Sequence, residues 1–255
     1  MHKRSKNHKK KSEWFYARGH RTKKERKKYK RAKKERRARN KRLITHYPFL
    51  GNVLNWRGYP VKNSDFDLIA LWDEVPEGWT NIFGRLMCDE IMNALNTPSE
   101  ASGITFEQCK EKYGGMRVYA AAPEPIQRIL SIYERISENI CCRCGKPHSP
   151  MMNFSWISPY CEDCFHKLQR KNKNFYQGEY TKYVPEDKEE WNIPTILRWK
   201  KFSKEGDQII EIDISSRIKA IEQRWEKMEV KKKKDKERKE RRRNGIPAEV
   251  KKETI

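Results

Sequence analysis

The chain has 255 residues, of which 36% are hydrophobic and 36% charged, and its formal net charge is +23. Residues 1–46 carry 22 Lys and Arg against 3 acidic residues, and residues 215–255 carry 16 against 8. The remaining 20 basic and 24 acidic residues lie between these segments, so the middle of the chain is nearly neutral. This composition excludes a hydrophobic core that spans the whole chain. With no apolar run near the roughly 20 residues of a membrane span, it also excludes a transmembrane protein.

Residues 1–42 form a basic arm. From residue 21 onward they are mostly Lys, Arg, Glu and Ala, which favour a helix, but apolar residues at helical spacing are missing. We expect the arm to be disordered alone and helical when a polyanion neutralises it. A net charge of +19 over residues 1–46 implies a partner rich in phosphate, so we expect RNA or DNA, ribosomal RNA included, bound mainly through its backbone. The representative phosphate contacts are Lys23, Lys24, Arg26, Lys27, Arg36, Arg37 and Arg39.

Residues 43–140 have the pattern of a mixed α+β core. The predicted elements are a short strand within 66–71, a helix from Thr80 or Asn81 to Leu95, a β-hairpin of 104–113 and 117–121 around Gly114-Gly115, and a helix over 124–140. The two helices follow from apolar residues that recur on one face. The hairpin follows from its two-glycine turn signal between strand-like segments.

Two carboxylates near the first predicted strand raise the question of enzyme activity. Asp65 and Asp67 alternate as the magnesium-binding carboxylates of nucleotidyltransferases do, but the Gly-Ser or Gly-Gly phosphate turn is absent because Gly51 precedes Asn52. We interpret the pair as solvated and expect no enzyme, with a metal-dependent nucleotidyltransferase or nuclease as the weaker alternative. A nuclease of the HNH kind needs His and Asn around its metal knuckles, whereas the only histidine between the cysteine pairs is His148.

The clearest motif lies in residues 141–170, which we expect to form a zinc module. Two Cys-x2-Cys pairs are separated by 16 residues, the spacing of a structural zinc site: Cys141 with Cys144, and Cys161 with Cys164. A strand between the pairs and a helix after the second pair suggest treble-clef-like knuckles. Possible substitute ligands are Cys142, His148 and His166, whereas Cys88 and Cys109 suit buried positions. A charged N-terminus without an apolar stretch lacks the pattern of a secretory signal, so we expect reduced thiols in a cytoplasmic protein.

The rest of the chain divides into a mixed extended segment, 171–214, and a basic helix and tail, 215–255. The helix has a narrow apolar stripe of Ile218, Ile221, Trp225 and Met228 that leads into the basic run 231–243. The basic run is a candidate second anchor on phosphates. The stripe supports an alternative function, in which the protein docks on a host complex or on a second copy of itself as an accessory factor.

Several segments, taken together, resemble a family of uncharacterised proteins from bacterial and phage genomes, which carry a KEKYGGLRFY-like segment before a zinc knuckle. The matching segments are 47–50 (YPFL), 76–79 (PEGW), 109–119 (CKEKYGGMRVY), 133–137 (YERIS), 144–147 (CGKP) and 156–161 (WISPYC). The resemblance covers residues 43–168 and departs at Met116 and Val118, where the family more often has leucine and an aromatic residue. It implies zinc and an origin in a bacterial or phage-infected cell, but no catalytic residues. The basic arms lie outside it.

Overall fold

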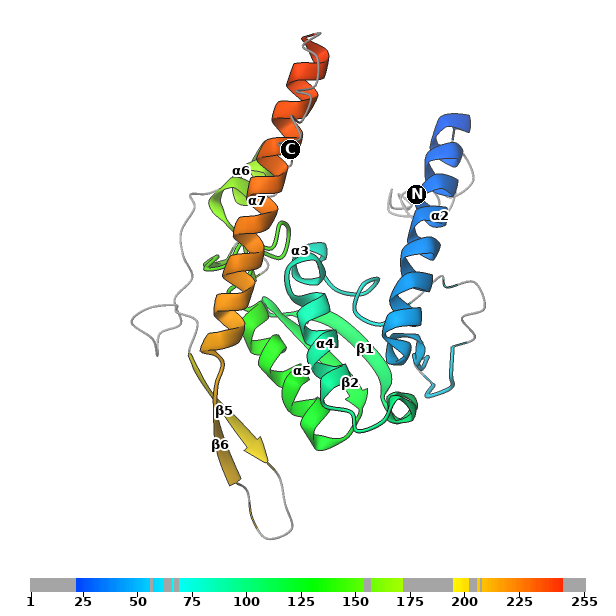
Figure 1. Ribbon diagram of the computed structural model, residues 1–255, viewed down its shortest axis with the longest axis vertical. Helices are drawn as coiled ribbons and strands as arrows, with labels where there is room; N and C mark the ends of the chain where they lie inside the picture. The colour runs from blue at the N-terminus through cyan, green and yellow to red at the C-terminus, as the bar shows by residue number, and fades with distance from the viewer. Residues whose placement is uncertain are drawn as a thin grey trace, which may run out of the picture.

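The computed structural model describes residues 22–55, 57–61, 66, 69–153, 157–171, 195–201, 206 and 208–244. Within them, helices combine with two-stranded antiparallel sheets, which confirms the predicted α+β class. Figure 1 shows a small core from which two long helices, α2 (Lys23–His46) and α7 (Ser215–Arg243), project at the same end. None of the described helices has both the length and the apolar composition needed to cross a membrane.

Of the two states expected for the basic arm, the structure has the helix. Helix α2 begins in a capping box, because the Thr22 side chain accepts from the Glu25 amide while the Glu25 carboxylate accepts from the Thr22 amide. It crosses the boundary placed at residues 42 and 43, since both Asn40 and Leu43 are buried. The helix therefore stands on the core by its last turns. Residues 1–21 and the Asp65 and Asp67 pair lie outside the described residues.

The base of α2 is fastened to the core through Asp73, whose side chain is 8% exposed. One carboxylate oxygen accepts from Arg39, and the other accepts from Asn40 Nδ2 at 2.8 Å and from the Ile69 amide at 3.1 Å. Asn40 Nδ2 also donates to the carbonyl of Phe66 at 2.8 Å. The buried carboxylate of Asp73 thus joins the last turns of α2 to the core turn that contains Ile69 and Asp73 itself.

Replacing Asp73 with Ala is expected to lower the free energy of unfolding by about 2–3 kcal/mol, because a buried amide and a guanidinium lose a charged partner together. Urea denaturation followed by far-UV circular dichroism measures the change. The matched control is Glu35→Ala, which removes the exposed Arg31–Glu35 pair on the same helix and should cost about 0.5 kcal/mol or less. Equal losses in the two variants would contradict the anchoring role of Asp73.

The short strand predicted within 66–71 is wrong for its described part. Residues 69–71 are buried but lie in a turn, and Leu71 has a φ of 68°. The Ala70 amide donates to the Leu50 carbonyl at 3.1 Å, so this apolar run packs against the 3₁₀ turn η1 (Pro48–Gly51). An apolar run of three or four residues predicts burial well and backbone conformation poorly.

The core is built from two helical segments and a hairpin. The first segment runs without a break through α3 (Glu77–Trp79), the π-helical stretch η2 (Thr80–Gly84) and α4 (Arg85–Asn93). The others are the 3₁₀ turn η3 (Pro98–Gly103), strands β1 (Thr105–Lys112) and β2 (Gly115–Ala121), and helix α5 (Glu124–Ser137). The predicted helices and hairpin are therefore confirmed, although the first helix begins three residues before Thr80 and the second ends at Ser137.

Tyr133 joins the two helical segments. Its hydroxyl donates to Glu90 Oε1 at 2.6 Å and its ring lies 5.4 Å from that of Phe83, centroid to centroid. The hairpin packs on α5, where the Met116 amide donates to Ser137 Oγ at 2.7 Å and the Val118 amide to Glu134 at 2.5 Å.

The hairpin turn is displaced by one residue from the predicted glycine pair. Tyr113 and Gly114 occupy the two turn positions with φ of 51° and 80°, as a type I′ turn requires, while Gly115 already pairs with Lys112 in the ladder. A Cβ on Gly114 would lie 2.3 Å from Met151 Sδ. The turn therefore lies directly against the segment between the two cysteine pairs.

The C-terminal part of the chain returns to the core. A hairpin of β5 (Ile196–Lys201) and β6 (Gln208–Asp213) leads into α7, whose Ile218 and Ile221 are buried in the main core. Trp225 and Met228 pack against the same core and are half-buried. The core thus covers the first half of the apolar stripe of α7, Ile218 and Ile221, and leaves Trp225 and Met228 partly exposed. The alternative docking function stays a prediction.

Candidate metal centre and basic helices

The first cysteine pair lies in a tight turn after α5. The Cys141 amide donates to the Lys146 carbonyl at 2.9 Å, and the Gly145 amide donates back to the Cys141 carbonyl at 2.9 Å. Gly145 has a φ of 84°, and a Cβ there would lie 2.7 Å from the carbonyl oxygen of Gly78. Glycine is therefore required both by the turn and by its contact with the start of α3.

The second cysteine pair lies at the start of α6 (Glu162–Lys171), as the sequence predicts. The amides of Cys164 and Phe165 both donate to the Cys161 carbonyl at 3.0 Å, which forms the first helical turn. Between the pairs, β3 (Met151–Asn153) and β4 (Ile157–Pro159) form a short antiparallel ladder. The strand predicted at residues 154–157 lies outside the described residues except for Ile157, which begins β4.

The four sulfur atoms of Cys141, Cys144, Cys161 and Cys164 lie within 4.8 Å of one another. The Sγ atoms of Cys144 and Cys161 are 3.5 Å apart, and all four thiols are free rather than joined in disulfides. Tetrahedral coordination at about 2.3 Å places thiolates about 3.8 Å apart, so this spacing suits one metal ion with little adjustment. Three of the four are 6% exposed or less, and Cys144 is half-buried. The cluster is therefore a largely buried candidate metal site.

Within the cluster the thiol pKa values move in opposite directions, since that of Cys141 is lowered while those of Cys144 and Cys164 are raised. Hydrogen bonds from the thiols of Cys144 and Cys161, and from their backbone amides, lower the pKa of Cys141 well below the ordinary thiol value. Neighbouring Cys142 differs, since burial raises its pKa to about 12. Burial raises the pKa of Cys164 to about 12 as well, so the pKa does not separate Cys142 from the cluster. Geometry does, because the converging sulfur atoms are those of Cys141, Cys144, Cys161 and Cys164, and Cys142 is not among them.

The other two candidate ligands have different partners. His148 is exposed, with its Nε2 atom 2.6 Å from Glu222 of α7. His166 has its Nδ1 atom 2.9 Å from Gln169 within α6. Cys88 and Cys109 are buried, as expected, at 0% and 3% exposed. Within the part of the chain that the structure describes, the four-cysteine group is the one place where potential ligand atoms converge.

The cysteine cluster is bonded to the core at the start of α3. The Gly78 amide donates to the Cys142 carbonyl at 3.0 Å, and the buried Trp79 Nε1 donates to the Ile140 carbonyl at 2.8 Å. A Cβ on Gly78 would lie 2.4 Å from the Cys141 carbonyl oxygen and 2.7 Å from that of Cys142. The segment Pro76-Glu77-Gly78-Trp79 is one of those that carry the family resemblance. Only the structure shows that the missing side chain of Gly78 leaves room for the backbone of the cysteine turn.

Helix α2 presents most of the predicted phosphate contacts to solvent. It holds 14 Lys and Arg against 2 Glu, and Lys23, Lys24, Arg26, Lys27 and Arg36 are exposed along it. Arg37 is half-buried. Arg39 has a different role from the one predicted, since it is half-buried and pairs with Asp73 at the base of the helix. Periodicity alone did not reveal which of these side chains faces the core.

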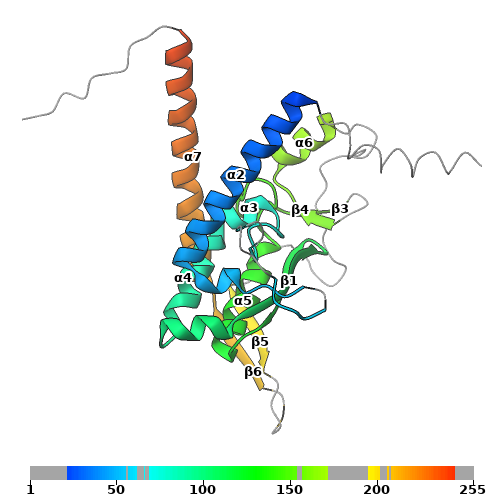
Figure 2. The ribbon, with the colours of Figure 1, turned by 90° about the vertical axis from the view of Figure 1, so that its right-hand side faces the viewer.

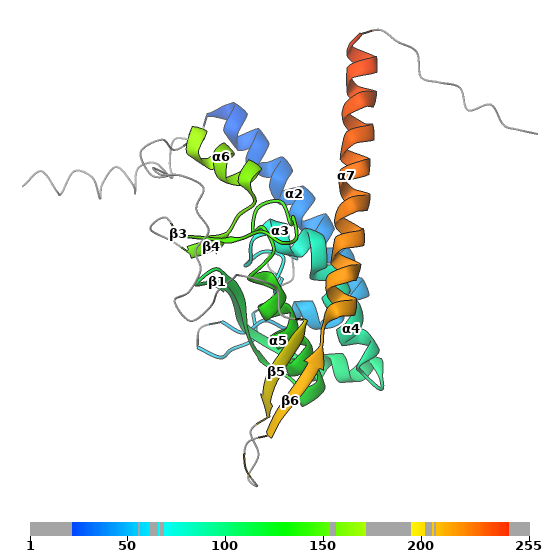
Figure 3. The ribbon, with the colours of Figure 1, turned by 90° about the vertical axis from the view of Figure 1, so that its left-hand side faces the viewer.

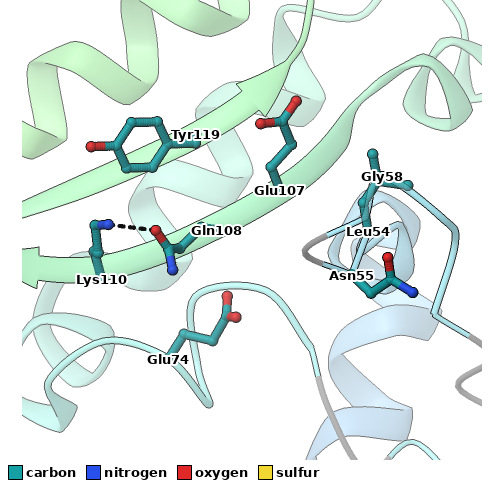
Figure 4. Close-up of a pocket in the computed structure, with 8 residues that line it drawn as sticks. All are labelled: Leu54, Asn55, Gly58, Glu74, Glu107, Gln108, Lys110 and Tyr119. Carbon is teal, nitrogen blue, oxygen red and sulfur yellow. Dashed lines mark hydrogen bonds between the residues drawn. The ribbon is translucent and has the colours of Figure 1, made fainter.

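A separate polar pocket of about 710 Å³ lies on the outer face of the β1–β2 hairpin (Figure 4). It is lined by Glu74 and Glu107, by Asn55, and by Lys110, whose ammonium group lies 5.1 Å from the ring centroid of Tyr119. Burial raises the pKa of Glu74, and its Oε2 atom is buried without a hydrogen-bond partner. The described residues that line this pocket carry two carboxylates, on Glu74 and Glu107, and one ammonium group, on Lys110.

Comparison of the chain with protein-family models, with curated proteins and with solved structures gave no match. The resemblance to the bacterial and phage family therefore stays a prediction. The functional argument rests on the cysteine cluster and the two long basic helices.

Proposed function

We propose that the protein is a non-catalytic nucleic-acid-binding protein whose cysteine cluster holds a structural zinc ion. Four thiolates with tetrahedral spacing are the ligand set of structural zinc sites, and they leave no open coordination position for water or substrate. A cysteine turn, the β3–β4 hairpin and a helix that begins at the second pair follow one another in chain order. This order supports a treble-clef-like module with a role in stability.

Nucleic acid is the proposed partner because of one observation: α2 carries 14 Lys and Arg, and every residue from 22 to 32 is exposed. Such a helix has no apolar face to dock on a protein or enter a membrane surface. It also concentrates positive charge that repels itself along the helix. Phosphate groups offset that repulsion and release condensed counterions, which favours binding that depends little on base sequence.

Fluorescence anisotropy with labelled DNA and RNA tests this proposal. We expect the full chain to bind, and its affinity to fall by about 10³-fold or more between about 50 and 200 mM salt, as for proteins with six or more phosphate contacts. A variant with Lys23, Lys24, Arg26 and Lys27 changed to Gln should bind about tenfold or more weakly, with a smaller salt slope. Gln keeps the helix propensity of the positions while removing their charge.

The matched control removes the same number of charges elsewhere, by changing Lys110, Lys112, Lys200 and Lys219 to Gln. These lysines lie on the two hairpins and the base of α7, away from α2. The control should retain the affinity of the unchanged chain to within about threefold. If both variants bind equally well, or if the full chain binds no nucleic acid near physiological salt, the proposed function is wrong.

A further inference from the structure

The two basic helices have a common orientation that the sequence does not reveal. Figure 1 shows α2 and α7 rising from the same end of the core, with the N-terminal end of α2 and the C-terminal end of α7 farthest from it, and Figures 2 and 3 show that the two helices diverge. The β5–β6 hairpin points away at the opposite end. The space beside the core at this end is therefore bordered by positive charge on two sides.

The base of α7 is fixed as firmly as that of α2. Arg217 pairs with Glu90 of α4 at 2.8 Å, next to the buried Ile218 and Ile221. One turn further on, Glu222 contacts His148 of the segment between the cysteine pairs. Because both helices are anchored in one core, the separation of their outer parts is set before any ligand binds.

The outer part of α7 repeats the chemistry of α2. Residues 231–243 hold 10 Lys and Arg against 3 acids, and all are exposed except the half-buried Asp235. Two of the acids already have a basic neighbour on the same helix, Asp235 with Arg238 at 3.5 Å and Glu240 with Lys236 at 3.9 Å. The excess charge is therefore positive, as on α2, and it is presented on a second rigid helix.

From this geometry we propose that α2 and residues 231–243 of α7 bind one and the same nucleic-acid double helix as two arms. This inference rests on the proposed nucleic-acid binding, and it specifies a double helix as the form of nucleic acid that is bound. A double helix is stiff and carries phosphates on both strands, so two anchored helices can reach it at once. An α-helix is about 10–12 Å wide and fits a B-form major groove about 12 Å wide, where phosphates border it on both sides.

Two arms on one core gain affinity without new contacts. Once the first arm is bound, the second binds in an intramolecular step at high effective concentration. Because the core fixes both bases, little freedom is lost in that step. A flexible single strand can follow one basic helix, but it does not hold its phosphates at a fixed separation. The arrangement therefore favours duplex over single strand.

The test uses the full chain and a DNA duplex of about 30 base pairs, nearly three helical turns, alongside one of its single strands. An α7 variant carries Gln at Lys233, Lys234, Lys239 and Arg242, and is compared with the α2 variant, with both together and with the charge-matched control. Far-UV circular dichroism verifies that each variant keeps its helices. Anisotropy gives the affinities, and titration at saturating concentration gives the number of duplexes bound per chain.

We expect one duplex per chain, about tenfold weaker binding for either arm variant, and the weakest binding when both are changed. The duplex should bind about tenfold or more tightly than the single strand. Binding that is weakened by the α2 changes and unaffected by the α7 changes would overturn the two-arm arrangement while leaving nucleic-acid binding intact. Two duplexes per chain, or a single strand bound as tightly as the duplex, would overturn it equally.

Discussion

Replacing Cys161 with Ser is expected to abolish metal binding at the proposed zinc site and to unfold the region from β3 to α6. The strands there are three residues long, and a ladder this short is marginally stable without the proposed ion between the two cysteine pairs. Structural zinc sites supply about 10–16 kcal/mol of apparent folding free energy in small zinc-finger peptides, so most of the stability of this region depends on coordination. The metal content per chain, by mass spectrometry, and amide hydrogen exchange across residues 141–171 measure the effect.

Cys142→Ala is the matched control, because this thiol is buried beside the cluster but outside it. That variant should keep one metal ion per chain and lose only the about 1–2 kcal/mol of a small packing defect. Chelation of the unchanged protein should reproduce the effect of Cys161→Ser. A protein that contains no metal as purified, yet protects the amides of α6 from exchange, would contradict the metal assignment.

Changing Gly78 to Ala is expected to destabilise the protein by about 3 kcal/mol or more, although it adds a single methyl group. That methyl would lie 2.4 Å from the Cys141 carbonyl oxygen and 2.7 Å from the Cys142 carbonyl carbon and oxygen. All three are backbone atoms, so no side chain can turn aside, and either α3 or the cysteine turn must move. The hydrogen bond from the Gly78 amide to Cys142 then weakens as well. The midpoint temperature of thermal unfolding should fall by about 6–12 °C.

Gly103→Ala is the comparison for this experiment, since a Cβ at Gly103 meets no atom within 4 Å. Its unfolding temperature should stay within about 2 °C of the unchanged protein. An unaltered unfolding temperature for Gly78→Ala would show that the cysteine turn is not held against α3.

The elements that sequence alone predicted are those whose causes are local. The periodic faces of α4 and α5, the glycine turn of β1–β2 and the spacing of the two cysteine pairs each depend on residues near in the chain. The spacing of the cysteine pairs was sufficient to select the four ligand candidates that converge, and to set Cys142 apart.

The features that sequence missed depend on residues far apart in the chain. The sequence presents Arg39 as one more basic residue of the arm, whereas in the structure it pairs with Asp73. The apolar residues 69–71 are typical of a strand, whereas in the structure they form a turn that packs against η1. The stripe of α7 is typical of a docking surface, whereas in the structure its Ile218 and Ile221 are buried in the protein's own core. In each case the local pattern predicts burial or charge correctly, and a distant residue decides what it contacts.

The closing of the core by α7 has a consequence for how the protein is made. Arg217 and its partner Glu90 are 127 positions apart, and Arg224 donates to the carbonyl of Asn81 across 143 positions. Because a chain leaves the ribosome from its N-terminus, the surface of η2 that α7 contacts stays open until α7 emerges. Contacts of such long range also slow folding. The nascent chain thus carries an uncovered apolar surface until α7 has been synthesised.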